Sequence, residues 1–391
     1  MRLPDRVARA LAGASAPVCA YVYDTAVLRA RAAELRAVLP EAGRLLYAVK
    51  ANGHPAVVRA LAAEVDGLEV ASAGELALAY AELLPHADRQ PWLAFSGPGK
   101  TDAELVAAAG AGAVVHVESA HELRRLSHLA GETPVRVALR VNRASARLPG
   151  THAMTGAPTP FGIDEAEVPP ACRLAAELPG IALIGFHLHA VSNNLDAAAH
   201  AAFAVDAVDW AVRAAAAQGV ALGYVNIGGG LGIDYTDGAT FDLAAFGAGL
   251  RRAALPPGAV LVVEPGRYLT ADAGWYAAQV LDLKRTHGRW FAVLRGGTHH
   301  FRLPAAWGYS HPCTVLPIDR WPYPFPRPEI VDAAVDVVGE LCTPRDVLSR
   351  DQKVARLRVG DVLVFGRTGG YGWDISHHEF LRHEYPEMLV I

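Results

Sequence analysis

Tyr47-Ala48-Val49-Lys50-Ala51-Asn52 is an apolar run that carries a single lysine and leads into the turn residues Gly53-His54-Pro55. Apolar, aromatic and β-branched residues bounded by Asn, Gly and Pro predict a buried β-strand, so Lys50 should lie where this strand opens onto the surface. An ammonium group at such a position needs a partner or loses its charge, and a Schiff base with an aldehyde removes the charge. The alternative is that Lys50 only extends its ammonium group from the strand end into solvent.

The surrounding sequence alternates short apolar strands with alanine-rich helices from about residue 25 to residue 270. Eight strands that alternate with helices indicate parallel pairing, for which a closed (β/α)8 TIM barrel is the economical arrangement. An open doubly wound sheet is the alternative, although no G-x-G-x-x-G sequence follows an early strand. The expected strands are residues 45–51, 67–71, 92–96, 113–117, 135–141, 181–189, 224–227 and 260–264.

The composition changes after about residue 270. Alanine-rich helical runs stop, Pro, Trp and Tyr become frequent, and residues 330–338 and 362–365 have the pattern of antiparallel strands. Residues 18–23 are also apolar and rich in strand-forming side chains. We therefore expect two domains, a barrel at residues 25–270 and an antiparallel β-domain formed by residues 1–24 together with residues 271–391.

Composition excludes several classes of function. The chain has 391 residues, 52% of them hydrophobic, and a formal net charge of −4. That charge is too small to indicate a nucleic-acid partner or a membrane surface, and no run of about eighteen apolar residues predicts a transmembrane helix. The four cysteines, Cys19, Cys172, Cys313 and Cys342, show no C-x-x-C spacing. Because they suggest neither a disulfide framework nor a zinc site, we expect a cytoplasmic protein.

The ends of the last three expected strands carry candidate site residues, because barrel active sites form at the C-terminal ends of strands. Gly228-Gly229-Gly230 lets backbone N–H groups approach an anion, although a glycine triplet alone is more often a tight turn. Glu264 and Arg267 either pair with each other or serve the ring nitrogen and the phosphate of a cofactor. His187 and His189 lack a third ligand at metal-binding spacing, so stacking of His189 on a flat cofactor is the better interpretation.

In this order, these segments resemble the fold-type III pyridoxal-phosphate decarboxylases, which include diaminopimelate and ornithine decarboxylases. The resemblance extends from about residue 18 to the C-terminus and also rests on Glu69-Val70-Ala71-Ser72 and Arg140-Val141-Asn142. It implies a pyridoxal 5'-phosphate cofactor held as a Schiff base on Lys50, with Glu264 at the pyridine nitrogen. The other cofactor-binding residues that it implies are His189, which stacks on the ring, and Ser192, Gly228, Gly229, Gly230, Arg267 and Tyr371.

The resemblance also implies a homodimer in which the two subunits share each active site. In this family a cysteine and an aspartate come from the partner subunit, and Cys342 and Asp346 stand at the matching positions. Cys342 would return a proton to the Cα of the substrate after carbon dioxide leaves, since a thiol can donate near neutral pH. Diaminopimelate decarboxylases have a glutamate directly after the cysteine, whereas this chain has Thr343.

The segment His299-His300-Phe301-Arg302 is similar to the siderophore-biosynthesis branch of the family, whose substrate is citryl-diaminopropionate. This similarity implies that His299, His300 and Arg302 bind a polycarboxylate tail, with Thr343 and Asp346 as further substrate-binding residues. The alternative is that the two histidines only brace the β-domain.

Three other functions remain open at this point. The chain could decarboxylate diaminopimelate or a basic amino acid such as ornithine or lysine. An amino-acid racemase is disfavoured by Glu264, since that branch is expected to use arginine at the ring nitrogen. A non-catalytic cofactor carrier is usually a barrel alone, and a regulatory homologue would be expected to lose Lys50 or Cys342, which are both present.

Overall fold

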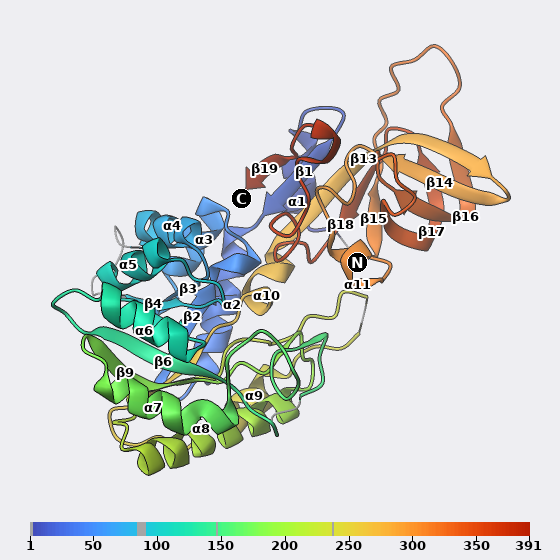
Figure 1. Ribbon diagram of the computed structural model, residues 1–391. Helices are drawn as coiled ribbons and strands as arrows, with labels where there is room; N and C mark the ends of the chain where they lie inside the picture. The colour runs from blue at the N-terminus through green and yellow to red at the C-terminus, as the bar shows by residue number, and fades with distance from the viewer. Residues whose placement is uncertain (1–2, 84–90, 146–147, 237) are drawn as a thin grey trace. The chain divides into compact units, whose positions relative to one another are not determined.

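The computed structural model describes residues 3–83, 91–145, 148–236 and 238–391 (Figure 1). The chain divides into two compact units. The first, called the barrel unit here, comprises Arg29–Asp234 and Ala239–Leu269. The second, called the β unit, comprises Met1–Leu28, Tyr235–Gly238 and Thr270–Ile391.

The barrel unit contains a closed sheet of eight parallel strands, which confirms the expected (β/α)8 fold over an open sheet. The strands follow one another around the barrel in chain order, and pairing of the first with the last closes the ring. They are β2 (Gly43–Ala48), β3 (Gly67–Val70), β4 (Trp92–Phe95), β5 (Val114–Val117), β6 (Val135–Asn142), β9 (Ile181–His187), β11 (Tyr224–Asn226) and β12 (Val260–Val263).

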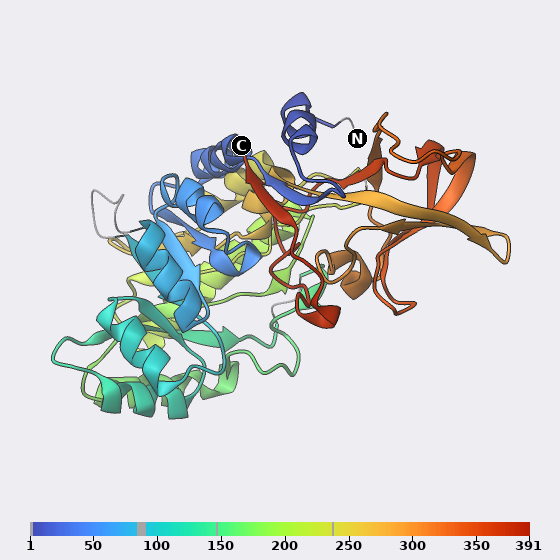
Figure 2. The same ribbon diagram turned by 90° about the horizontal axis from the view of Figure 1, so that it is seen from above.

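Helices cover the outer face of this sheet, as the views in Figures 1 and 2 show. Local sequence fixes their ends: Asp196 caps α8 by accepting a hydrogen bond from the Ala199 N–H, and Gly219 ends the helix with a positive φ of 68°. The helices are α2 (Thr25–Val38), α3 (Pro55–Ala62), α4 (Ala73–Leu83), α5 (Asp102–Gly110), α6 (Ala120–Leu129), α7 (Val168–Glu177), α8 (Ala197–Gln218) and α9 (Leu243–Leu250).

Short elements follow several strands of the barrel and carry polar residues. The sheet itself is buried on both faces, which is why its strands read as nearly continuous apolar runs. These short elements are η1 (Val49–Ala51), β7 (His152–Ala153), β8 (Ile163–Asp164), η3 (Glu165–Glu167), β10 (Val191–Ser192) and α10 (Arg267–Thr270).

The β unit is built on an eight-stranded sheet, with β13 and β14 forming a long hairpin (Figure 1). Most of its strand pairs are antiparallel, as expected, but β1 pairs with β19 and β14 pairs with β16 in parallel, so the sheet is mixed. The strands are β1 (Cys19–Tyr23), β13 (Gly274–Thr286), β14 (Arg289–Leu294), β15 (Cys313–Leu316), β16 (Glu329–Val338), β17 (Val347–Arg358), β18 (Val362–Phe365) and β19 (Glu387–Val390).

Small helices complete the β unit. Val7 and Leu11 of α1 (Asp5–Ala12) pack on apolar side chains of β1, β13 and β18 to form its core. The other helices are η4 (Ala271–Ala273), α11 (Leu303–Trp307) and η5 (Phe380–Arg382). Among the described residues, no helix has the length and apolar character needed to cross a membrane.

Candidate active site

Lys50 lies just beyond the C-terminal end of β2, on the single turn η1, rather than on the strand as expected. Its ammonium group pairs with the carboxylate of Glu69, which projects from β3 and is buried. The Lys50 side chain is 47% exposed, so the amine remains accessible to a small molecule. A carboxylate inside the apolar strand Gly67–Val70 is a sequence signal that could have identified Glu69 as a site residue.

The glycine loop follows β11 and packs against two other candidate residues. A Cβ atom on Gly228, whose φ is 71°, would lie 2.2 Å from Nδ1 of His189. A Cβ atom on Gly229 would lie 2.3 Å from the backbone oxygen of Glu264. Only glycine permits this close approach, so the loop brings bare backbone beside His189 and the end of β12.

Glu264, directly after β12, is buried, and each of its oxygens has a different neighbour. The Asn226 amide donates to Oε1 at 2.5 Å, whereas Nε2 of His187 lies 3.7 Å from Oε2. Burial raises the pKa of Glu264 to about 8, with a further increase from the negative charge of Glu69. The carboxyl group therefore holds a proton at neutral pH in the protein without a cofactor.

Two buried histidines lie beside Glu264. The rings of His116, on β5, and His187, at the end of β9, are 4.1 Å apart between centroids. Burial is the largest cause that lowers the pKa of both rings well below the usual value, so both are neutral. Ligand atoms of His116, His187 and Glu264 lie within 4.8 Å of one another, so the fold brings to His187 two side chains that have no metal-binding spacing in the sequence.

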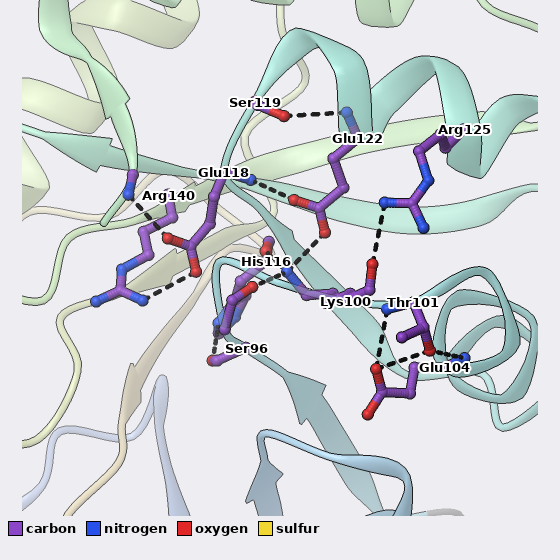
Figure 3. A network of polar contacts seen from close by, with 12 residues as sticks. Ser96, Lys100, Thr101, Glu104, His116, Glu118, Ser119, Glu122, Arg125 and Arg140 are labelled. Carbon is purple, nitrogen blue, oxygen red and sulfur yellow. Dashed lines mark hydrogen bonds and ion pairs between the residues drawn. The ribbon is translucent and has the colours of Figure 1, made fainter. Parts of the chain in front are cut away.

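A second ion pair borders this site and was not predicted from the sequence. Arg140, on β6, donates to the Glu118 carboxylate at 3.0 Å, and both side chains are buried (Figure 3). The Arg140 guanidinium also stacks on the ring of Phe161. Its positive charge contributes to the lowered pKa values of His116 and His187.

The other expected cofactor-binding residues lie in both units. Arg267 is buried at the start of α10, and Ser192 lies on β10, both in the barrel unit. Tyr371 lies in the β unit, after β18, with a positive φ of 56°. Their role in binding the cofactor remains a prediction.

Cys342 is displayed on a loop between β16 and β17, and it is exposed. Burial raises the pKa of Cys19 and Cys172 to about 11 and that of Cys313 to about 12, which makes them poor proton donors at neutral pH. Cys342 is therefore the cysteine that is best placed to exchange protons with a substrate.

Asp346 holds this loop from the inside. Its carboxylate is buried and accepts hydrogen bonds from the backbone N–H groups of Thr298 at 2.6 Å and Leu341 at 2.9 Å. Asp346 therefore shapes the turn that contains Cys342, and its contact with a substrate stays a prediction.

The β unit contains a cavity of about 830 Å³ with a cationic lining. Arg302, Arg345 and Arg350 line it together with Thr343 and His377, and no described lining residue is acidic. Within the described chain, the guanidinium groups of Arg302 and Arg345 have no carboxylate partner. The structure thus brings two of the predicted substrate residues, Arg302 and Thr343, to one cavity.

His299 and His300 do not line this cavity. Both are fully buried, and their rings lie 3.8 Å apart between centroids. Burial lowers the pKa of His299 to about 4 and that of His300 to about 2, so neither carries a charge for an anion. Their contact with a substrate stays a prediction, and so does the alternative that they only brace the β unit.

The residues around Glu264 fit the expected cofactor. Both ring nitrogens of His187 and Nδ1 of His189 are buried and lack a hydrogen-bond partner among the described residues. Bare backbone at Gly228 and Gly229 adjoins these groups. A flat, phosphorylated ring needs polar atoms that have no other partner and backbone that no side chain covers, and this site offers both.

Comparison with known proteins agrees with this geometry. Residues 25–271 match the family described as "Pyridoxal-dependent decarboxylase, pyridoxal binding domain", and the chain belongs to this family. It is 38% identical, over 100% of this chain and 98% of the relative, to the "2-[(L-alanin-3-ylcarbamoyl)methyl]-2-hydroxybutanedioate decarboxylase" of Staphylococcus aureus. It is 32% identical, over 95% of this chain and 86% of the relative, to the diaminopimelate decarboxylase of Methanothermobacter thermautotrophicus.

Solved structures show the same fold. Diaminopimelate decarboxylase from Helicobacter pylori, complexed with L-lysine, superposes with a TM-score of 0.83 at 23% identity and covers 96% of this chain and 91% of its own. The chain is thus a pyridoxal-phosphate-dependent decarboxylase. When bound, the cofactor supplies the electron sink for the bond to the departing carboxylate.

Proposed function

We propose that this enzyme decarboxylates an amino acid whose far end carries carboxylates, of the citryl-diaminopropionate type, in siderophore biosynthesis. The observation that best supports this proposal is the cavity of the β unit, which is lined by Arg302, Arg345 and Arg350 and has no acidic residue among its described lining. A citrate-derived tail bears two carboxylates and a hydroxyl group, and guanidinium groups bind carboxylates in a bidentate manner. The similarity to the Staphylococcus aureus decarboxylase, which is named for such a compound, supports the same substrate.

A substrate with a distal ammonium group suits this cavity poorly. The guanidinium groups of Arg302 and Arg345 would repel an amine, whereas the charge of Arg350 is offset by an ion pair with Asp336. The position after Cys342 is Thr343, which has no charge to attract an amine. These features argue against the alternative that the enzyme acts on diaminopimelate, ornithine or lysine.

Within this proposal the barrel residues divide the work at the reacting end. Lys50 would hold the cofactor by its amine, and Glu264 would keep a proton at the pyridine nitrogen. His189 would lie against the ring, while the glycine loop and Arg267 would bind the phosphate. The supporting observations are the accessible amine of Lys50 and the unpartnered atoms around Glu264.

We further propose a homodimer in which Cys342 of one copy returns the proton to Cα in the site of the other. The exposure of Cys342 on a loop that Asp346 holds in shape supports this role. Tyr371 completes the phosphate site in this proposal. The four cysteines are free, which supports a cytoplasmic location.

The test is release of carbon dioxide by the purified protein from citryl-diaminopropionate, meso-diaminopimelate, ornithine and lysine. Release from the citryl conjugate alone is the expected result. Release from diaminopimelate at a higher kcat/KM would keep the reaction and overturn the substrate. A cofactor absorbance band with release from none of the four would favour the alternative of a cofactor carrier.

A further inference from the structure

Donor and acceptor can be assigned for each hydrogen bond around Glu264, starting from the glycine loop. The Gly228 N–H donates to Oδ1 of Asn226 at 2.7 Å, and this contact identifies the other end of the side chain as the amide NH2 group. Its two hydrogens go to Oε1 of Glu264 at 2.5 Å and to the Tyr224 hydroxyl oxygen at 2.8 Å. All four residues belong to the barrel unit.

The donors and acceptors of the next hydrogen bonds, inside the barrel, can be assigned in the same way. Burial raises the pKa of Tyr224 well above its usual value, so the hydroxyl keeps its proton. Its only acceptor among the described residues is Nε2 of His116, at 3.0 Å. His116 must then carry its proton on Nδ1, which lies 2.9 Å from Oγ of Ser96 (Figure 3). Lys100, whose amine contacts the His116 backbone oxygen at 2.8 Å, adds a positive charge that helps to keep this ring neutral.

We infer that these residues form a positioning network that holds Glu264 by Oε1 and leaves Oε2 as the oxygen that serves the pyridine nitrogen of the cofactor. The inference rests on the proposed place of Glu264 at that nitrogen. Among the described residues, Oε2 has no donor closer than Nε2 of His187, at 3.7 Å, whereas Oε1 already accepts a hydrogen bond from Asn226. The residues of the network are Asn226, Tyr224, His116 and Ser96.

The network also bears on whether His116, His187 and Glu264 could bind a metal ion. Nε2 of His116 accepts the Tyr224 hydroxyl, so its lone pair is already used. A tetrahedral ion needs free lone pairs from every ligand. The cluster of His116, His187 and Glu264 is therefore poorly suited to a tetrahedral metal ion.

Several charged and titratable groups face Glu264 and shift its pKa, and the network affects that pKa in addition to them. Glu69 raises its pKa, while the positive charges of Lys50 and Arg140 lower it, and His187 and His116 are neutral neighbours. Loss of the hydrogen bond to Oε1 would leave the Glu264 carboxylate less stabilised, so its pKa would rise. Glu264 would then compete better for the proton, and the pyridine nitrogen would lose it at lower pH.

The experiment uses the holoenzyme loaded with pyridoxal phosphate that carries 15N in the ring, and follows the ring-nitrogen chemical shift against pH. Tyr224→Phe should lower the midpoint of ring deprotonation by about one pH unit, the size expected for loss of part of one charge-assisted hydrogen bond. Ser96→Ala, at the far end of the network, should lower it by less. Tyr21→Phe is the matched control, because its buried hydroxyl donates to the His300 backbone oxygen outside the network and in the β unit.

The outcomes separate this inference from the proposed role of Glu264. If Glu264→Gln shifts the midpoint but Tyr224→Phe and Ser96→Ala do not, the network is refuted while Glu264 keeps its place. If Glu264→Gln leaves the midpoint unchanged, the place of Glu264 itself is wrong. Equal shifts in Tyr224→Phe and Tyr21→Phe would mean a general loss of packing and would also refute the network. Ser96→Ala decides the matter if Tyr224→Phe does not fold.

Discussion

Replacement of Arg302 by glutamine tests whether the cationic cavity of the β unit binds the distal end of the substrate. Arg302 is exposed, lines the cavity, and has no ion-pair partner among the described residues. The substitution removes the charge while it keeps a polar side chain of moderate length. Arg302→Gln should therefore weaken substrate binding without disturbing the barrel unit, where the reacting groups lie.

The binding free energy that Arg302→Gln should lose lies between two limits. A hydrogen bond to a charged group contributes about 1.5–3 kcal/mol, whereas an exposed ion pair contributes about 0.2–1 kcal/mol. Because Arg302 is exposed but faces a cavity that a bound substrate would fill, we expect a loss of about 1–2 kcal/mol. This corresponds to a rise in KM of about 5- to 30-fold. The value of kcat should change little, since the tail interacts equally in the ground state and the transition state.

The assay is steady-state release of carbon dioxide from citryl-diaminopropionate. Arg356→Gln is the matched control, because Arg356 pairs with Glu329 on the sheet surface and does not line the cavity. An unchanged KM in Arg302→Gln, or an equal rise in Arg356→Gln, would refute the assignment of the cavity. A loss of kcat at constant KM would instead place Arg302 at the reacting end.

Four further predictions follow from the sites described above. Lys50→Ala should abolish both turnover and the cofactor absorbance band, and a retained band would place the cofactor on another group. Glu264→Gln should still bind the cofactor but lower kcat by at least about tenfold, so unchanged turnover would remove its assigned role. Cys342→Ala should slow product formation by roughly 100-fold, as expected for loss of a general acid, and unchanged kcat would point to another proton donor. Burial lowers the pKa of His311 to about 4, below the unfolded value of about 6.5, so its stabilising contribution is lost as the pH falls through this range. Between pH 7 and pH 5 the His311→Gln variant should therefore lose about 2 kcal/mol less of its free energy of unfolding than the unchanged protein, as measured in urea.

The barrel could be predicted because each strand is buried on both faces and each helix has its own end signals. Seven of the expected strands contain or nearly coincide with the observed ones, for example 67–71 against Gly67–Val70. The first expected strand extends past its observed end at Ala48, because η1 begins at Val49. A short 3-10 turn and a strand end share the same apolar composition, so sequence alone does not separate them.

The strand directions in the β unit were harder to predict. Alternation of polar and apolar residues identifies a strand but not the direction of its neighbour. The parallel pairs arise from chain segments far apart in sequence: β19 at the C-terminus lies beside β1, and β16 lies beside β14. Their pairing depends on the paths of the connections, which the residue pattern of each strand does not contain.

In the site, the sequence identified residues whose type alone suggests chemistry, and it missed those that act through neighbours. Lys50 and Glu264 stand out because a charged side chain ends an apolar strand. The resemblance to the siderophore-biosynthesis branch implies that His299 and His300 bind an anion, but their rings are inside the β unit and neutral. The type of a side chain does not reveal whether its polar atoms reach solvent.

The orientation of Glu264 is the strongest case of information that only the closed barrel holds. Asn226 binds Oε1 of Glu264 and thereby leaves Oε2 available. The Asn226 amide is oriented by a hydrogen bond from the Gly228 N–H to its oxygen and by a hydrogen bond from its nitrogen to the Tyr224 hydroxyl. Tyr224 in turn bonds to His116, 108 positions away in the sequence. The two residues meet because β5 and β11 both direct side chains into the same barrel interior. A change such as Tyr224→Phe would leave every recognisable motif intact and still release the carboxylate, which is why we expect the proton at the ring nitrogen, rather than the affinity for the cofactor, to report it first.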